Sequence, residues 1–225
     1  MPPHLLVLPS PFLGPAAYGP VVAALSSLGL GASVADVPAD PEGACLVDAW
    51  SAAARGVDDV VLVPHSNAGY LAPTVSAAAG GAPVVFVDAA LPVTTGSTTL
   101  APPAFREHLA ALAGPDGRLP RWTRWWPRAD VAAVLPGPLL EDLDSLLPEV
   151  PLSYVDGEVP VPPGWQAGAR AYLALGTTYA EELAVARAHR WPTRVLDDAG
   201  HLHLLVDPGE TARVVADLLD ALRLR

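Results

Sequence analysis

Short, continuous apolar runs alternate with longer amphipathic stretches along most of this chain, and this alternation restricts the fold more than any other feature. The runs lack the strict apolar–polar alternation of a strand that faces water on one side. Such runs are typical of strands buried on both faces, and strands that alternate with helices form parallel sheets. We therefore predict a doubly wound α/β domain with a mainly parallel, six-stranded sheet. The predicted strands are residues 4–10, 31–38, 58–65, 82–91, 169–178 and 192–200, and the predicted helices are 18–29, 43–56, 67–79, 179–190 and 208–225.

Residues 92–165 interrupt this rhythm. They contain helix-like segments, many prolines and three tryptophans close together in the stretch RWTRWWPR. We predict that this segment is a helical cap, or lid, inserted between the fourth and fifth strands of the sheet. Residues 1–91 and 166–225 would then form the core.

Composition excludes several classes of function. A length of 225 residues is typical of one domain with a sizeable core. The net charge of −11 disfavours nucleic acids and anionic membranes as partners, and no run approaches the roughly 18 apolar residues of a membrane span. All thirteen basic residues are Arg, which excludes Schiff-base chemistry and Ser–Lys dyads.

The remaining compositional features concern compartment and partners. The start of the chain lacks the features of a signal peptide, and Cys45 is the single cysteine, so we expect a cytoplasmic protein without a disulfide. The richness in Ala, Pro and Arg indicates a GC-rich genome, which favours a bacterial source. No His or Cys pair has metal-ligand spacing supported by carboxylates, so we expect neither a metal nor a cofactor. The expected partner is a small-molecule substrate, bound by a monomer or a homodimer.

Residues 60–72, VVLVPHSNAGYLA, contain the first candidate for chemistry. An apolar run ends sharply near Ser66 and a helix-forming segment follows. Ser66 is either the N-cap of that helix or a nucleophile exposed at the turn from strand to helix. The G-x-S-x-G pattern of such a turn is altered here, because Pro64 and Ala68 replace the two glycines.

A histidine near the end of the chain favours the nucleophile. His201 lies in the stretch DDAGHLHLLVDP, after the last predicted strand. The order of nucleophile followed by a late histidine is that of the α/β-hydrolases. The neighbouring His203 and the His65 that precedes the serine are interpreted as packing residues.

Four stretches together resemble the α/β-hydrolase superfamily, and within it the branch of small esterases and hydroxynitrile lyases. They are LVLPSPFLGPAAYGP at 6–20, PHSNAG at 64–69, VFVDAALP at 85–92 and DAGHLHLLVDP at 198–208. The resemblance covers nearly the whole chain. It implies that Ser66 is the nucleophile of an esterase-type hydrolase and that His201 is its general base.

The acid of a catalytic triad departs from the family's pattern. The family usually carries it just after the fifth core strand, where this chain has Thr177, Thr178 and Tyr179. We expect Asp88 to replace it, because Asp88 ends the neighbouring strand and the catalytic groups of a parallel sheet gather beyond the carboxyl ends of its strands. The alternatives are that Glu181 or Glu182 of the following loop and helix reaches the histidine instead, or that no acid operates.

The oxyanion hole departs from the pattern as well. One N–H donor should come from the residue after the nucleophile, Asn67, and the other from the first loop. The first-loop position aligns with Pro11, which has no N–H. Three alternatives follow: the loop is shifted so that Phe12 donates, the Ser10 hydroxyl substitutes, or the hole is half built.

The aromatic residues of the cap are candidates for the substrate pocket. Trp126 and Trp122 are the principal candidates, and the wider set is Phe105, Trp125, Tyr154 and Trp165. The alternative is that these rings only attach the cap to the core. The sequence thus predicts a serine-dependent hydrolase of a small, largely apolar ester or thioester. A lyase, isomerase or cyclase on the same fold, or a catalytically silent ligand-binding protein, stays open.

Overall fold

The computed structural model describes residues 2–224, so that Met1 and Arg225, the two ends of the predicted core, lie outside the described residues. It contains a six-stranded, entirely parallel sheet in the order β2-β1-β3-β4-β7-β8. The strands are β1 (His4–Leu8), β2 (Gly31–Val34), β3 (Val60–Ser66), β4 (Val84–Ala89), β7 (Arg170–Leu175) and β8 (Thr193–Leu196). Every residue of β3, β4 and β7 is buried. The prediction of a doubly wound α/β fold with strands buried on both faces is confirmed.

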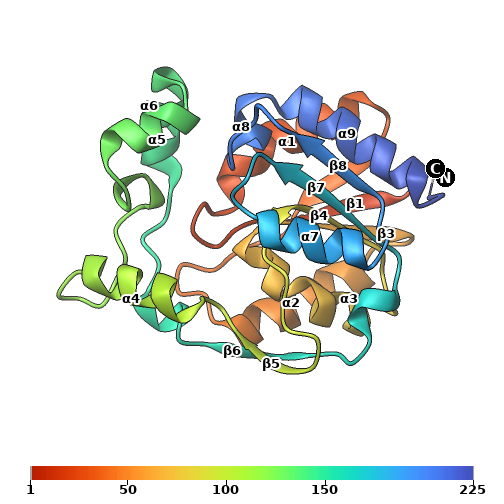
Figure 1. The fold of residues 1–225 in the computed structure, drawn as a ribbon, viewed down its shortest axis with the longest axis horizontal. Helices are drawn as coiled ribbons and strands as arrows, with labels where there is room; N and C mark the ends of the chain where they lie inside the picture. The colour runs from red at the N-terminus through yellow and green to blue at the C-terminus, as the bar shows by residue number, and fades with distance from the viewer. Residues whose placement is uncertain (1, 225) are drawn as a thin grey trace.

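Helices cover both faces of the sheet (Figure 1). On one face lie α1 (Gly19–Ser27), α8 (His203–Val206) and α9 (Pro208–Ala221), and on the other lie α2 (Gly43–Arg55), α3 (Ala72–Ala78) and α7 (Ala180–Ala188). The side chains that point to the two faces form two separate buried apolar clusters. Because neighbouring residues of a strand point to opposite faces, β1 alone contributes Leu6 to one cluster and Leu5 to the other.

The segment after β3 differs from the single helix predicted at 67–79. It is a short 3₁₀ helix, η2 (Asn67–Tyr70), followed by α3, which begins at Ala72. Pro73 lies in the first turn of α3 and has no N–H, so it cannot continue a helix that begins earlier but is well suited to start a new one.

Residues 92–165 lie between β4 and β7, two neighbours in the sheet. They form helices α4 (Pro103–Leu112), η3 (Trp122–Arg124), α5 (Arg128–Val134), α6 (Gly137–Leu146) and η4 (Leu152–Tyr154), and α4 to α6 project from one side of the core (Figure 1). The segment also contains an antiparallel pair, β5 (Gly96–Thr99) and β6 (Glu158–Val161), which the prediction of a purely helical cap missed. Both strands are short, β5 is polar and β6 contains Pro160, so neither has the composition of a core strand.

Two further 3₁₀ helices, η1 (Pro15–Tyr18) and η5 (Trp165–Ala167), complete the secondary structure of residues 2–224. Within this range no helix is long and apolar enough to cross a membrane.

Candidate active site

Ser66 ends β3 in a strained conformation. Its φ of 57° and ψ of −130° lie where L-residues with a side chain are rare. The Ser66 side chain does not cap η2, which argues against the N-cap interpretation. The close packing at this turn depends on Gly69, since a Cβ there would lie 1.9 Å from the carbonyl oxygen of Ala90. Ala68, by contrast, fits where the usual pattern has glycine.

His201 and Asp88 complete a chain of hydrogen bonds that begins at Ser66. His201 Nε2 lies 3.1 Å from Ser66 Oγ, and His201 Nδ1 lies 2.7 Å from Asp88 Oδ2. Asp88 is fully buried, and its Oδ1 accepts a bond of 2.9 Å from the backbone N–H of Leu175. An ionised carboxylate only accepts hydrogen bonds, so His201 Nδ1 carries the proton and donates to Asp88. His201 Nε2 then accepts a hydrogen bond from the hydroxyl of Ser66. The predicted proximity of Asp88 to His201 is confirmed, while its catalytic role stays a prediction.

His65 stabilises this arrangement through two contacts with His201. Its ring stacks on that of His201 at 4.8 Å, and its Nε2 donates to the carbonyl oxygen of His201 at 3.2 Å. Its Nδ1 accepts from the hydroxyl of Tyr18 at 2.7 Å, and that hydroxyl accepts from the backbone N–H of Ser10 at 2.9 Å. Burial, with a contribution from His201, lowers the pKa of His65 well below its usual value. Neutral His65 therefore ties the His201 loop to the first loop, which is more than the packing role expected.

Tyr179 is a site residue that the sequence interpretation missed. Its hydroxyl lies 3.5 Å from Ser66 Oγ, and its ring centroid lies 5.4 Å from that of His201. Because Ser66 gives its one proton to His201, Tyr179 is the donor to Ser66. Burial raises the pKa of Tyr179, which keeps this donor protonated. The available signal was its place after β7, where the α/β-hydrolase pattern described above has an acid.

The first loop contains one candidate for a backbone donor, the N–H of Phe12. The carbonyl oxygen of Ser10 accepts from the N–H groups of Leu13 and Gly14, both at 3.0 Å, so residues 10–13 form a turn. This turn leaves the N–H of Phe12 unused, and Phe12 lines the cavity beside Ser66. Ser10 does not line that cavity, and its hydroxyl is buried without a partner among the described residues. The structure therefore favours Phe12 over Ser10 as the first-loop donor.

Asn67 links the strand-to-helix turn after Ser66 to the cap. Its backbone N–H lies at the start of η2, where helix geometry provides no internal acceptor. Its side chain donates to the carbonyl oxygen of Leu100 at 2.6 Å and accepts from the hydroxyl of Tyr154 at 2.6 Å. These two bonds fix the orientation of the side chain, and the backbone N–H of Asn67 is left without an acceptor inside η2.

A cavity of about 740 Å³ opens beside Ser66 and His201. Its aromatic lining is Phe12, Tyr70, Phe105, Trp122, Trp125, Trp126 and Tyr179, and its carboxylates are Asp130, Glu181 and Glu182. Two of the aromatic candidates do not line it. Trp165 packs against Phe86 and Trp191 on the core, and Tyr154 instead holds Asn67. These two rings attach the cap, whereas Trp122 and Trp126 lie on the wall.

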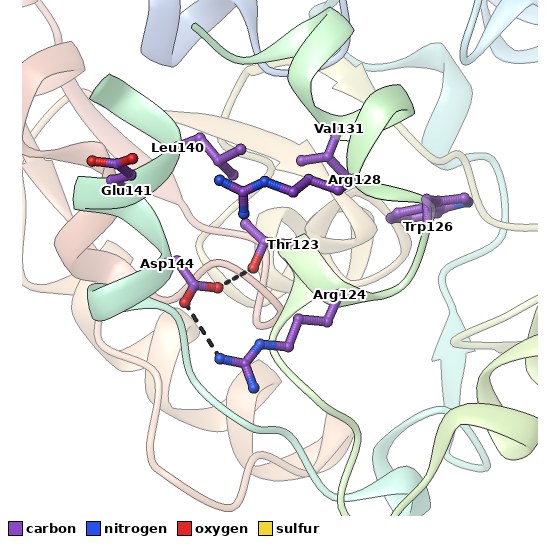
Figure 2. A pocket seen from close by; sticks show the side chains of 8 residues that line it. All are labelled: Thr123, Arg124, Trp126, Arg128, Val131, Leu140, Glu141 and Asp144. Carbon is purple, nitrogen blue, oxygen red and sulfur yellow. Dashed lines mark hydrogen bonds and ion pairs between the residues drawn. The ribbon is translucent and has the colours of Figure 1, made fainter. Parts of the chain in front are cut away.

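A second cavity, of about 410 Å³, lies within the cap between η3, α5 and α6 (Figure 2). Thr123 donates to Asp144, and Arg124 forms an ion pair of 3.5 Å with the same carboxylate. Arg128 also lines this cavity. Trp126 and Val131 line both cavities, so the two are adjacent, but Ser66 and His201 line only the larger one.

No group of His, Cys, Asp or Glu side chains in residues 2–224 is arranged to hold a metal ion. Comparison with known proteins gives no matching family model and no matching curated sequence.

Solved structures do match across nearly the whole chain. An extracellular α/β-hydrolase from a Paenibacillus species superposes with a TM-score of 0.77 at 13% identity, covering 96% of this chain and 99% of that one. Tomato Methylketone Synthase I gives 0.74 at 13% identity, with 99% of both chains covered. Polyneuridine aldehyde esterase gives 0.71 at 14% identity, with 97% and 99% covered. The chain thus has the α/β-hydrolase fold.

Proposed function

We propose that this chain is a serine-dependent hydrolase of carboxylic esters or thioesters. The observation that carries the proposal is the hydrogen-bond chain from Ser66 through His201 to the buried Asp88. The strained backbone of Ser66 supports it, because strain at a turn over a binding cavity is characteristic of an exposed nucleophile. The esterases among the structural neighbours are consistent with the same chemistry.

The proposed reaction follows the usual two steps of acyl transfer. His201 Nε2 removes the proton of Ser66 as Oγ attacks the carbonyl carbon, and the oxyanion that forms accepts from the N–H groups of Asn67 and Phe12. His201 then protonates the leaving alcohol or thiol as its bond to carbon breaks. In the second step a water gives a proton to His201 and attacks the acyl carbon, and His201 returns that proton to Ser66 Oγ as the bond to Ser66 breaks and the acid is released. Asp88 holds the imidazole in the required tautomer throughout.

Tyr179 acts on the same atom as His201. As a neutral donor to Ser66 Oγ, it stabilises negative charge on that oxygen when Ser66 departs from the acyl-enzyme. The cap segment contributes the aromatic wall of the cavity, and we assign it the role of a lid that excludes water from the reacting groups.

Labelling with a fluorophosphonate probe tests the proposal. The purified protein should be labelled at Ser66, and Ser66→Ala should abolish labelling and lower ester turnover by on the order of 10⁶-fold. Circular dichroism of the variant serves as the control for folding. An unlabelled wild type, or full turnover by Ser66→Ala, would contradict the mechanism.

A second candidate function is supported by Pro11. Since Pro11 offers no N–H, the first loop has one backbone donor fewer where a tetrahedral oxyanion would lie. With weak oxyanion stabilisation, Ser66 and His201 would instead move protons in a lyase, isomerase or cyclase reaction. The mass of the product distinguishes the two candidates, because hydrolysis adds one water and isomerisation adds none.

A further inference from the structure

Apart from His201 and the tyrosines, the ionisable acidic and basic side chains on the wall of the active-site cavity are all carboxylates. They are Asp130, Glu181 and Glu182, and none of the three forms an ion pair within residues 2–224. No arginine lines this cavity. Two arginines of the same part of the cap, at 124 and 128, line the smaller cavity instead (Figure 2). An anionic ligand would therefore meet repulsion in the large cavity, and a cationic ligand would meet attraction.

Glu182 is the most informative of the three carboxylates. It is half-buried in the first turn of α7, and it acts electrostatically on Tyr70 and Tyr179, which lie on the same wall. Burial raises the pKa of Glu182, and the neighbouring charges of Glu181 and Asp88 raise it further. A half-buried carboxylate surrounded by like charges is stabilised in its ionised form when a cation enters the cavity.

The wall also contains a cluster of aromatic rings that pack against one another in tilted arrangements. The ring centroids of Trp122 and Trp126 lie 5.0 Å apart, those of Trp125 and Trp126 lie 5.6 Å apart, and Phe105 lies 6.0 Å from Trp125. Tryptophan faces attract ammonium groups through the ring quadrupole, and quaternary ammonium ligands are commonly recognised by such aromatic walls. Aromatic rings and unpaired carboxylates facing one cavity are complementary to a cation with an apolar surface.

We propose that the cavity selects esters that carry an ammonium group, preferably an alkylated one. The carboxylate of Glu182 provides this selectivity by attracting the positive charge. The inference rests on the proposed ester hydrolysis and names its substrate class. The same carboxylates repel the carboxylate product, so they favour release of the acid after hydrolysis.

Two esters of one acid test the proposal by kinetics. A choline ester and its 3,3-dimethylbutyl analogue differ only by the replacement of the quaternary nitrogen with carbon. The ratio of their kcat/KM values should be about tenfold or more in favour of the choline ester. Glu182→Gln should lower this ratio by about tenfold, and any loss common to both esters cancels in the ratio. Glu107→Gln, in the exposed part of α4 and away from the cavity, should leave the ratio unchanged.

A binding experiment separates failure of this inference from failure of the esterase proposal. In the Ser66→Ala variant, choline and 3,3-dimethylbutanol are titrated while the fluorescence of the cavity tryptophans is followed. Tighter binding of choline, lost in Ser66→Ala/Glu182→Gln, supports the inference even if no ester is hydrolysed. Equal kcat/KM for the two esters, equal binding of the two alcohols, or a charge preference that persists in Glu182→Gln would overturn it.

Discussion

The two sides of Ser66 are built in different ways. On the side of β4, the side chains of Asp88 and His201 complete a hydrogen-bond chain, and Asp88 lies on β4 instead of after β7, where the resemblance predicts an acid. On the side of β1, the site depends on the backbone of a turn in which Pro11 removes one N–H. A carboxylate can move to a neighbouring strand because the ends of parallel strands converge. A backbone donor cannot be replaced so freely, because its position is fixed by the turn that contains it.

The largest effect is expected on the β4 side. Asp88→Asn should keep the fold and lower kcat by about 10⁴-fold, because the amide stabilises the wrong tautomer of His201. Asp58→Asn, an exposed carboxylate before β3, is the matched control and should retain full activity. If Asp88→Asn retained turnover within tenfold of the wild type, the acid would have to come from elsewhere, and the two sides would be equally incomplete.

The β1 side is tested by removing its remaining donor. Phe12→Pro should lower kcat by about 10²–10³-fold, as expected for the loss of one oxyanion donor. Phe12→Ala is the reference, because it removes the same ring contacts and keeps the N–H. The thermal midpoints of both variants establish that the difference is not one of folding. Equal kcat values for the two folded variants would show that Phe12 does not donate.

His65 belongs to both sides, and its effect should be seen in stability. In the unfolded chain its pKa is about 6.5, and in the folded protein burial depresses it, so below pH 6.5 only the unfolded state takes up the proton. Its contribution to stability is thus fully present above pH 6.5 and is lost as the pH falls. Between pH 8 and 5 the free energy of unfolding should fall by up to about 2 kcal/mol from this group.

Urea unfolding of the wild type and His65→Gln at these two pH values measures that contribution. Glutamine can donate to the carbonyl of His201 but does not titrate, so the acid-induced loss should be smaller in the variant by about the same 2 kcal/mol. Parallel losses in the two proteins would show that His65 takes up its proton in the folded state.

The smallest effect is expected for Ser10→Ala, which sharpens the comparison on the β1 side. The Ser10 hydroxyl is buried without a partner within residues 2–224, so its removal should leave kcat/KM within about twofold and leave stability unchanged or slightly raised. Ester kinetics and a thermal melt suffice. A loss of about 100-fold would instead make the hydroxyl an oxyanion donor and reverse the assignment to Phe12.

The sequence predicted the sheet from local patterns, and the resemblance to the α/β-hydrolases predicted that Ser66 and His201 meet, with Asp88 added from its place at a strand end. Continuous apolar runs indicate buried strands, and the residues at their carboxyl ends must share one edge of the sheet. These patterns do not depend on how the helices pack against the sheet. The same reasoning indicated that Asp88 could take the place of the missing acid.

The features that the sequence did not predict depend on contacts between residues far apart in the chain. The hydrogen bonds of Tyr18 to His65 and of Tyr179 to Ser66 join residues 47 and 113 positions apart, with no local signal at either end. The pairing of β5 with β6 joins two strands on opposite sides of the inserted helices, and neither strand is apolar enough to be recognised alone. Gly69 is required because of the carbonyl oxygen of Ala90, which only the folded packing brings near.

The insertion between β4 and β7 has a consequence for the chain as it leaves the ribosome. Domains emerge with the N-terminal part first, so β1 to β4, with Ser66 and Asp88, are synthesised before the helical segment and the last two strands. His201 follows Asp88 by 113 residues, and β7 reaches β4 only by closing the long inserted loop. A nascent chain therefore carries a serine without its base. Under the proposed mechanism, esters can be hydrolysed only after the final stage of folding brings His201 to Ser66.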